Sequence, residues 1–471
     1  MLRDRLWTEP MQQRPQATDP VCAAELSDPL APLRELPAFS FESLSEVRSF
    51  PAGVSGKAMA QDKENRGGRT PSAHPKVNAH VHLPPNFSAF ETVEQAVDLA
   101  AGAGLEVLGS SNYYDFGVYA RFAQSARSRA IFPLFGLEII SLVAELKTAG
   151  IKLNDPDNPG RMYLCGKGIT KFAPMPVAAE RMMQQIRDAD RARMEAMIER
   201  LNALMQRNGA ATALTAASVQ SALARRYAVP ASTVYLQERH VAQAFQEALF
   251  AQFGTRKRAD LLRRLLGVEC TAPDDPMTVQ NQFRSQLMKA GRPAYVEDSV
   301  LDDEMAYELV LALGGVPCYP ILADGASPVG EFEDSVDDLV GALTARGIWC
   351  AEFIPRRNAA TTVDRYARAL RGAGIIVLGG TEHNTLELAP MTPECKGGVP
   401  VSEHVAGLFW EGACVVAAHQ YLSARGQTGY VDARGNLNPG FPTLDHRIGA
   451  LARLGSTVIE AFRRSDGNKS A

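Results

Sequence analysis

The feature that most constrains the fold is a regular alternation of short apolar strands with amphipathic helices, which begins near residue 76. Apolar runs at 105–109 and 131–140 have the length and composition of buried strands. Apolar residues at helical spacing precede each of them, at 93–101 and at 118–129. Strands that alternate with helices at this pitch are typical of parallel β-α units. The sequence therefore predicts an α/β fold.

A long stretch of helical patterns interrupts this alternation between about 175 and 312. The strand and helix patterns then return, at 315–322, 335–346, 348–354, 362–372 and 374–380. From these changes we predict five parts. They are a leader without stable order (1–75), a first β-α part (76–174), an all-helical insertion (175–312), a second β-α part (313–390) and a helical C-terminal extension (391–471). The leader is rich in Pro, Ser, Gly, Arg and Glu, and its apolar surface is too small to offset the loss of chain entropy.

The composition excludes several classes of protein. With 471 residues, of which 46% are hydrophobic, the chain can bury a sizeable core. A net charge of −4, from 49 basic and 53 acidic residues, offers no electrostatic surface for nucleic acid or an anionic membrane, so we expect a small-molecule partner. Seven cysteines without a Cys-x-x-Cys pair predict reduced, buried thiols. Without an apolar run of membrane-spanning length or a signal peptide, we expect a cytoplasmic location.

Two histidines, His80 and His82, stand at the end of the first predicted strand, 76–82. Residues two apart in a strand share a face, so the two imidazoles converge. Neutral imidazole is the commonest protein ligand for zinc, manganese and iron. The pair alone also fits two unrelated histidines near a strand end, and residues further along the chain favour a metal-binding position.

Further polar residues follow or end other predicted strands. They are Asn112, Asp115, Glu138, Asp324, Glu352, Glu382, His383 and Asn384. In a parallel β-α fold the reactive groups gather where the strands end, so we expect these side chains on one rim. Several carboxylates on one rim repel one another unless a cation lies between them. The pattern thus favours a metal centre.

Four short motifs occur along the chain in the order in which similar motifs occur in the polymerase and histidinol phosphatase (PHP) superfamily, which the chain therefore resembles. They are His-x-His at 80–82, Gly-x-Glu at 136–138, Val-Pro-x-x-x-x-Leu-Ala at 316–323 and Gly-Gly-Thr-Glu-His at 379–383. The resemblance covers about 76–172 and 313–390. It implies a distorted (β/α)7 TIM-like barrel with a two- or three-metal site of zinc, manganese or iron, and commonly a phosphoesterase activity.

The resemblance carries over residue by residue. His80 and His82 match the first metal-binding pair, and Glu138 matches the bridging glutamate. Glu382 stands where the family usually has an aspartate, and His383 or Asn384 stands near its histidine. Three imidazoles of the family pattern are absent, at 111–114, 163–166 and 323–325. We therefore expect one or two divalent ions, held by His80, His82, Glu138, Glu382 and His383, with Asp324 as an additional ligand.

A bound divalent ion lowers the pKa of its water toward neutrality and polarises a phosphoryl or carbonyl oxygen. The expected catalytic residues are Glu138, Asp324, Arg356 and Lys167, of which the two cations are placed to meet an anionic group. The main hypothesis is a phosphoesterase that acts on a small phosphorylated metabolite through metal-bound hydroxide. One alternative is a metal-dependent isomerase or lyase of a sugar or uronic acid, in which Glu138 or Asp324 moves the proton. Another is a barrel that binds a metabolite without turning it over.

Overall fold

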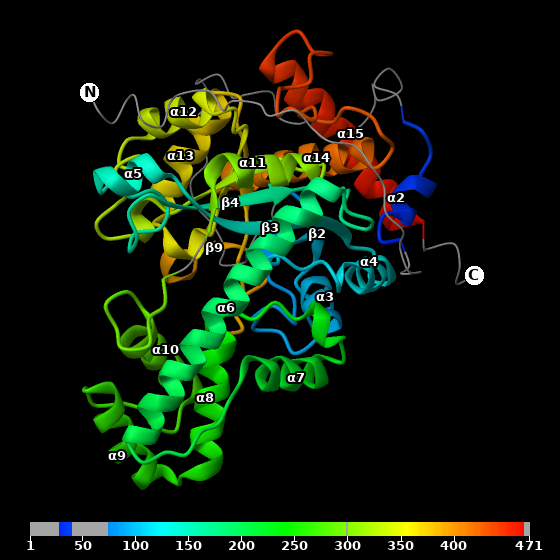
Figure 1. The fold of residues 1–471 in the computed structure, drawn as a ribbon. Helices are drawn as coiled ribbons and strands as arrows, with labels where there is room; N and C mark the ends of the chain where they lie inside the picture. Colours follow the sequence, from blue (N-terminus) through cyan, green and yellow to red (C-terminus); the bar gives the residue numbers. More distant parts are fainter. Residues whose placement is uncertain (1–27, 40–73, 298–299, 466–471) are drawn as a thin grey trace, which may run out of the picture.

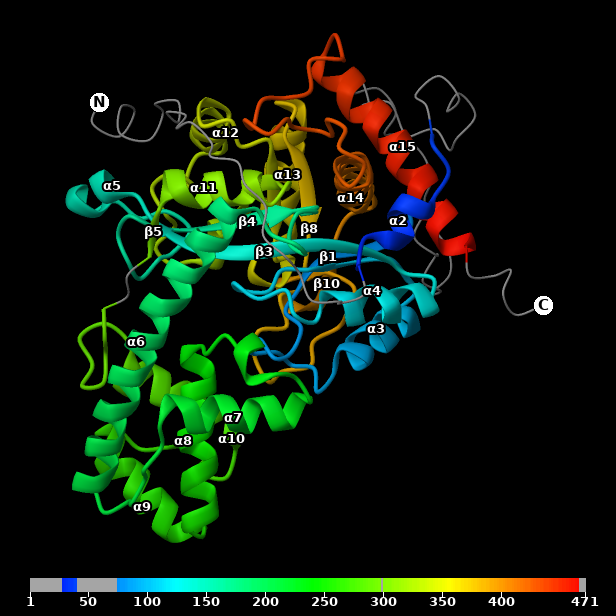
Figure 2. The same cartoon turned by 45° about the vertical axis from the view of Figure 1, so that its right-hand side comes forward.

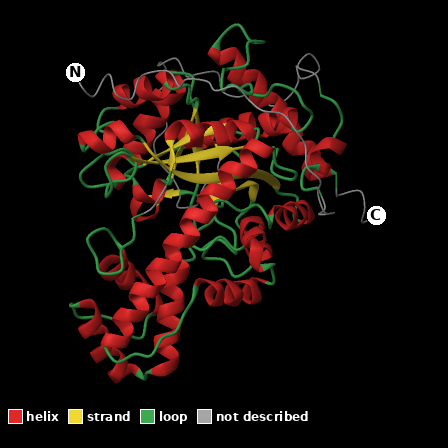
Figure 3. Cartoon of the chain, in the orientation of Figure 1, coloured by secondary structure: helices red, strands yellow, loops and turns green. Residues whose placement is uncertain are grey.

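The computed structural model describes residues 28–39, 74–297 and 300–465. A barrel-like sheet with surrounding helices forms the main body, and an all-helical lobe projects from one side of it (Figures 1 and 3). The strands lie side by side in the order β1 (Lys76–Val81), β2 (Leu105–Ser110), β3 (Phe132–Leu142), β4 (Arg161–Lys167), β6 (Val316–Ile321), β7 (Cys350–Phe353) and β8 (Ile376–Gly379). A two-residue strand, β5 (Leu301–Asp302), pairs with β3 outside this order.

The residues that follow β8 close the sheet into a barrel. The N–H groups of Thr381 and Glu382 donate to the His80 carbonyl at 3.1 and 2.9 Å, and the His82 N–H donates to the Glu382 carbonyl at 2.8 Å. These bonds join the last strand to the first. The chain therefore has the distorted seven-stranded α/β barrel that the family resemblance implies.

Strand β4 is the distortion, because it runs antiparallel to both of its neighbours. Gly136 of β3 pairs with Lys167, and Cys165 pairs with Cys318 of β6, both in antiparallel register. The expectation of parallel strands throughout is therefore wrong at this position. The connection between β3 and β4 contains only the six-residue helix α5 (Ala144–Ala149), so it lacks the crossover helix that a parallel neighbour needs.

Helices cover the outside of the barrel. They are α3 (Val93–Gly102), α4 (Tyr119–Ser128), α11 (Asp303–Ala312), α12 (Val336–Ala345), α13 (Ala360–Gly372), α14 (Glu403–Ser423) and α15 (Leu444–Arg464). Helix α14 is buried along most of its length, and the Gln420 amide bonds to the main chain of Pro133 and Phe135 in β3. The predicted C-terminal extension is thus part of the main core.

The lobe has a hydrophobic core of its own, formed by buried side chains between Met194 and Ala294. Its helices are α6 (Val177–Arg207), α7 (Ala216–Tyr227), α8 (Glu238–Gln252), α9 (Thr255–Leu266) and α10 (Pro276–Phe283). Helix α6 runs from the barrel into the lobe (Figure 2): Met183 packs in the barrel core and Met197 in the lobe core. Helix α11 packs in the barrel core, so the lobe ends before it and not at 312.

Part of the predicted leader is ordered against the barrel. Helix α2 (Ala31–Glu35) lies in the segment 28–39, where Leu30 and Leu33 are buried and the Tyr421 hydroxyl donates to the Pro37 carbonyl at 2.6 Å. The rest of that leader, 1–27 and 40–73, lies outside the described residues.

Two expectations from composition are tested in the described ranges. Six of the seven cysteines are buried free thiols, as the sequence predicts, and Cys22 falls outside those ranges. None of the described helices has both the length and the apolar character that crossing a membrane requires.

Candidate metal centre

Three side chains converge inside the barrel: those of His80 and His82, at the C-terminal end of β1, and that of Glu138, in the middle of β3. The Nε2 atoms of His80 and His82 lie 3.3 Å apart. The Glu138 Oε2 atom lies 3.0 Å from the His82 Nε2 and 3.6 Å from the His80 Nε2. All three side chains are at most 6% exposed. The predicted pair of imidazoles and the predicted Gly-x-Glu carboxylate therefore meet at one point.

The donor atoms of this group fit a divalent metal ion. Glu138 Oε2 is buried and has no hydrogen-bond partner among the described residues, although two imidazole nitrogens lie close to it. A buried carboxylate oxygen without a hydrogen bond is costly. Two imidazoles and one carboxylate form a donor set that zinc, manganese and iron accept. A shared ion would satisfy all three atoms at once.

Glu352, on β7, orients the first of these ligands. Its Oε1 atom lies 2.9 Å from the Nδ1 of His80, and neither side chain is more than 1% exposed. With a metal ion bound, a proton on Nδ1 directed at this carboxylate would leave the Nε2 lone pair free to bind that ion. His82 has no such support, because its Nδ1 is buried without a hydrogen bond among the described residues. The sequence pattern places Glu352 on the rim without indicating a role, although a charged residue within the apolar run 348–354 is itself a signal.

The electrostatics of the group follow from burial and from close opposite charges. Burial alone lowers the pKa of His80, but the Glu352 carboxylate outweighs this effect and the pKa rises to about 9. Burial raises the pKa of Glu138, yet the two imidazoles hold it well below its usual range. For Glu352, burial is outweighed by Lys167 and His80, which lower the pKa to about 2. Both carboxylates are therefore ionised near neutral pH.

Lys167, which the sequence predicts to meet an anionic group of a substrate, meets a carboxylate of the protein itself. Its Nζ atom lies 2.6 Å from the Glu352 Oε2, 3.0 Å from the Ser111 Oγ and 3.3 Å from the Ala79 carbonyl. The side chain is 4% exposed. The ammonium group is therefore held inside the barrel, on the far side of the His80 ring from Glu138.

Glu382 and His383 are not brought to the three-residue group. Both have left-handed backbones, with φ of 59° and 53°, in the tight turn that closes the barrel. The Glu382 carboxylate pairs with Arg357 and accepts from the Asn384 amide. His383 has both ring nitrogens engaged, Nδ1 with the Thr381 Oγ1 at 2.7 Å and Nε2 with the Ala389 carbonyl at 2.9 Å. The expectation that these two residues bind the same metal needs correction, because the turn directs their side chains elsewhere.

Asp324 also has a structural role in place of the expected chemical one. Its carboxylate accepts from the Asn358 amide at 2.8 Å, from the Ala359 N–H at 3.1 Å and from the Thr362 hydroxyl at 3.0 Å. These partners lie just before and in the first turn of α13, where a carboxylate offsets unpaired N–H groups and the helix dipole. Asp324 thus stabilises a helix terminus.

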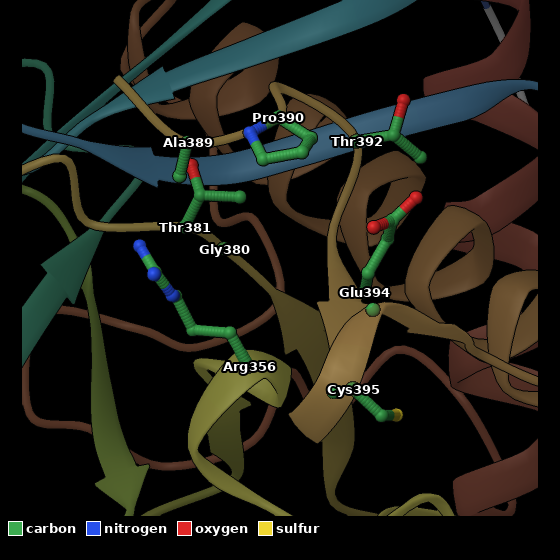
Figure 4. A pocket seen from close by; sticks show the side chains of 10 residues that line it. Arg356, Gly380, Thr381, Ala389, Pro390, Thr392, Glu394 and Cys395 are labelled. Atoms are coloured by element: carbon green, nitrogen blue, oxygen red, sulfur yellow. The ribbon is translucent and has the colours of Figure 1, made fainter. Parts of the chain in front are cut away.

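Arg356 lines a separate cavity of about 240 Å³, together with Thr381, Ala389 and Cys395 (Figure 4). Its guanidinium pairs with Glu387 at 2.8 Å. Gly380 separates this cavity from the metal candidates, since a Cβ atom there would lie only 2.4 Å from the Cβ of His80. The cavity is therefore adjacent to the centre but does not contain its donor atoms.

Two other arginines, Arg357 and Arg239, and Tyr113 border the centre. Tyr113 stacks on the His82 ring with 5.1 Å between ring centroids and 18° between planes. The negative charge of Glu382 has the largest effect on the pKa of Arg357 and raises it, and the Glu138 carboxylate also raises it. Burial and Arg284 lower the pKa of Arg239 to about 10, whereas Glu382 raises it. Arg239 belongs to α8 of the lobe, so no local motif could have linked it to this site.

The lobe contacts the loops that follow β1 and β2. The Phe87 N–H donates to the Gln237 side chain at 2.6 Å, and Arg187 of α6 donates to the Tyr114 carbonyl at 2.7 Å. The Tyr114 ring packs edge-on against Tyr235 at 5.1 Å. The lobe therefore lies directly over the rim that carries the histidines.

No protein-family model matches this chain, and no curated protein matches it significantly. A solved structure described as a "putative metal-dependent phosphoesterase" from Bifidobacterium adolescentis is 16% identical, over 71% of this chain and 95% of that chain, with a TM-score of 0.44. An amidohydrolase from Chromobacterium violaceum, with bound sulfate and no metal, is 15% identical, over 69% and 94%, with a TM-score of 0.45. Neither likeness is strong enough to assign this chain a family or an activity.

The fold and the site by themselves define a class. The chain is a distorted seven-stranded α/β barrel that carries a His-His-Glu candidate metal centre, with a helical lobe over its rim.

Proposed function

We propose that the chain is a metal-dependent hydrolase whose divalent ion is held by His80, His82 and Glu138. The observation that carries the proposal is the convergence of three buried donor atoms on one point, with a carboxylate oxygen that has no hydrogen bond in the described structure. Zinc, manganese and iron suit this donor set. A divalent ion in this position would polarise a phosphoryl oxygen and make water acidic enough to attack near neutral pH.

We further propose that the substrate is a small phosphorylated metabolite. Arg357 and Arg239 come from opposite sides, the barrel and the lobe, and both interact electrostatically with Glu382 and Tyr113. Arg239 makes no ion pair with a described residue, and its guanidinium lies 5.8 Å from the Phe87 ring centroid. Guanidinium groups suit phosphate because they donate two parallel hydrogen bonds. We propose that these two arginines orient the phosphate.

The lobe would exclude water and restrict the size of the substrate. It contacts the loops after β1 and β2, and the three ligand side chains at this rim are almost fully buried. A closed, low-dielectric site strengthens the interaction of the arginines with an anion. This arrangement favours a small metabolite of the cytoplasm over a macromolecular or membrane partner.

A second candidate keeps the metal and changes the reaction. Among the described residues three donor side chains converge at this point, and 111–114, 163–166 and 323–325 contain no histidine that could add a fourth. A site with so few ligands also suits an isomerase or lyase of a sugar or uronic acid, in which the metal polarises a carbonyl.

Elemental analysis of the purified protein tests the proposal. We expect bound metal in the wild type and almost none in His80→Ala/His82→Ala. His404→Ala/His446→Ala removes two imidazoles far from the centre and serves as the matched control. Equal, negligible metal in the wild type and the first variant would end the proposal. Phosphorylated sugars and nucleotides, assayed beside unphosphorylated sugar acids with the recovered metal, separate the two reactions.

A further inference from the structure

A second group of donor atoms lies on the other side of the His80 ring. His80, Cys165 and Glu352 each place one donor atom within 4.8 Å of the others. All three side chains are buried. Imidazole, thiolate and carboxylate are common ligands of transition metals. By its chemistry alone, this group could hold a second ion beside the first.

The Lys167 ammonium lies among these donor atoms. It is 2.6 Å from the Glu352 Oε2 and 3.5 Å from the His80 Nδ1. An ammonium group has three hydrogens, and three acceptors surround this one: Glu352, the Ser111 hydroxyl and the Ala79 carbonyl. Because every donor is used, the ammonium is fixed in place.

The position of Lys167 follows from the antiparallel direction of β4. Lys167 is the last residue of that strand and pairs with Gly136 of β3 on one side and Val316 of β6 on the other. A strand running the other way would bring its first residue to this end of the barrel. The same reversal that distorts the barrel therefore places Lys167, and not Arg161 from the other end of the strand, beside the candidate ligands.

We infer that the Lys167 ammonium takes the place of a second metal ion and that the centre holds a single divalent ion. The ammonium neutralises Glu352, the carboxylate that a second ion would need. Like charges a few ångströms apart in a buried site repel strongly because little water screens them. Glu352 remains free to accept from His80 and orient it toward the first ion. The inference rests on the proposed function for that first ion.

The test counts Mn²⁺ ions bound per chain by equilibrium dialysis and records their electron paramagnetic resonance spectrum. We expect one ion and the spectrum of an isolated Mn²⁺ in the wild type. In Lys167→Ala the second group is freed, and we expect two ions with a spin-coupled spectrum. Lys171→Ala, which removes an exposed lysine four residues away, should stay at one.

The outcomes separate this inference from the proposed function. Two ions in the wild type, or a single ion in a folded Lys167→Ala protein, would overturn the inference and leave the proposed function standing. No bound ion in the wild type would overturn the proposed function, and the inference with it. If Lys167→Ala does not fold, Lys167→Ser leaves the space open with a small polar side chain, and the same counts decide the question.

Discussion

At the scale of single residues, the candidate centre depends on what the two ring nitrogens of His80 contact. One ring nitrogen faces the donor atoms of His82 and Glu138, and the other faces Glu352. Glu352 in turn holds Lys167 at 2.6 Å. One carboxylate therefore both orients a metal ligand and compensates a buried cation, so its loss has two separate consequences.

Replacing Glu352 with Gln should lower both stability and metal affinity. Removing one partner of a buried ion pair leaves the Lys167 charge uncompensated, so the free energy of unfolding should fall by about 3–5 kcal/mol. Loss of the orienting carboxylate should weaken metal binding by roughly 10- to 100-fold. Chemical denaturation measures the first effect, and competition with a metal chelator measures the second. Glu394→Gln, on β9 (Glu394–Cys395) away from the group, is the control, and unchanged affinity in Glu352→Gln would contradict the orienting role.

Glu333 should make stability depend on pH. Its carboxylate is 1% exposed and accepts the main-chain N–H groups of Leu322 and Ala323, and burial raises its pKa to about 7. The folded protein therefore keeps a proton that the unfolded chain releases at lower pH. Stability is lost as the pH rises from about 4.5 to about 7, and above that range the full cost of the buried charge is present.

Denaturation of the wild type and Glu333→Gln measures this cost. Between about pH 5 and about pH 8 the wild type should lose on the order of 3 kcal/mol relative to the variant. Asp334→Asn removes the neighbouring exposed carboxylate and should show no such difference. Parallel pH profiles for wild type and Glu333→Gln would contradict the prediction.

At the scale of elements, sequence patterns located most strands and helices to within a few residues. The strand predicted at 315–322 is Val316–Ile321, and the helix predicted at 335–346 is Val336–Ala345. These positions follow from hydrophobic periodicity, which is local. The direction of β4 could not be predicted in this way, because an alternating apolar pattern is the same for parallel and antiparallel pairing.

The packing of α14 on α15 depends on one glycine. A Cβ atom at Gly455 would lie 1.8 Å from the Cys414 carbonyl oxygen, a main-chain atom that cannot move aside. Gly455→Ala should therefore lower the free energy of unfolding by about 1–3 kcal/mol or more. Gly449, in the same helix, would place its Cβ no closer than 3.6 Å to a side-chain atom.

Gly449→Ala is therefore the matched control, and it should stabilise the protein by up to about 1 kcal/mol because alanine favours helix. Thermal and chemical unfolding of both variants measure the two effects. Equal changes in both variants would mean that close contact between the helices does not decide the outcome.

At the scale of the whole molecule, the lobe and the barrel meet at the candidate centre. The two bodies have separate hydrophobic cores and share helix α6. Arg239 is the clearest consequence of this meeting, since it comes from the lobe and interacts electrostatically with Glu382 of the barrel.

Arg239→Ala should weaken the binding of inorganic phosphate and raise KM for a phosphorylated substrate. A hydrogen bond to a charged group contributes enough that the loss should be on the order of 10- to 100-fold. Product inhibition by phosphate and steady-state kinetics measure the effect, with metal content as a check that the centre is intact. Arg256→Ala removes an exposed arginine of α9 and should change neither quantity. An unaltered phosphate affinity in Arg239→Ala would show that the lobe does not contribute to anion binding.

The sequence by itself determined the order of strands and helices, the presence of an interrupting helical block and the paired histidines, because each depends on neighbouring residues along the chain. The Gly-x-Glu motif already placed Glu138 with these histidines, but only the tertiary structure decided that Glu382 and His383 do not join them. That choice depends on the left-handed turn at 382 and 383, which directs their side chains to Arg357 and Thr381. It also decided that Lys167 faces Glu352 inside the barrel, because the direction of β4 is a property of its neighbours in space.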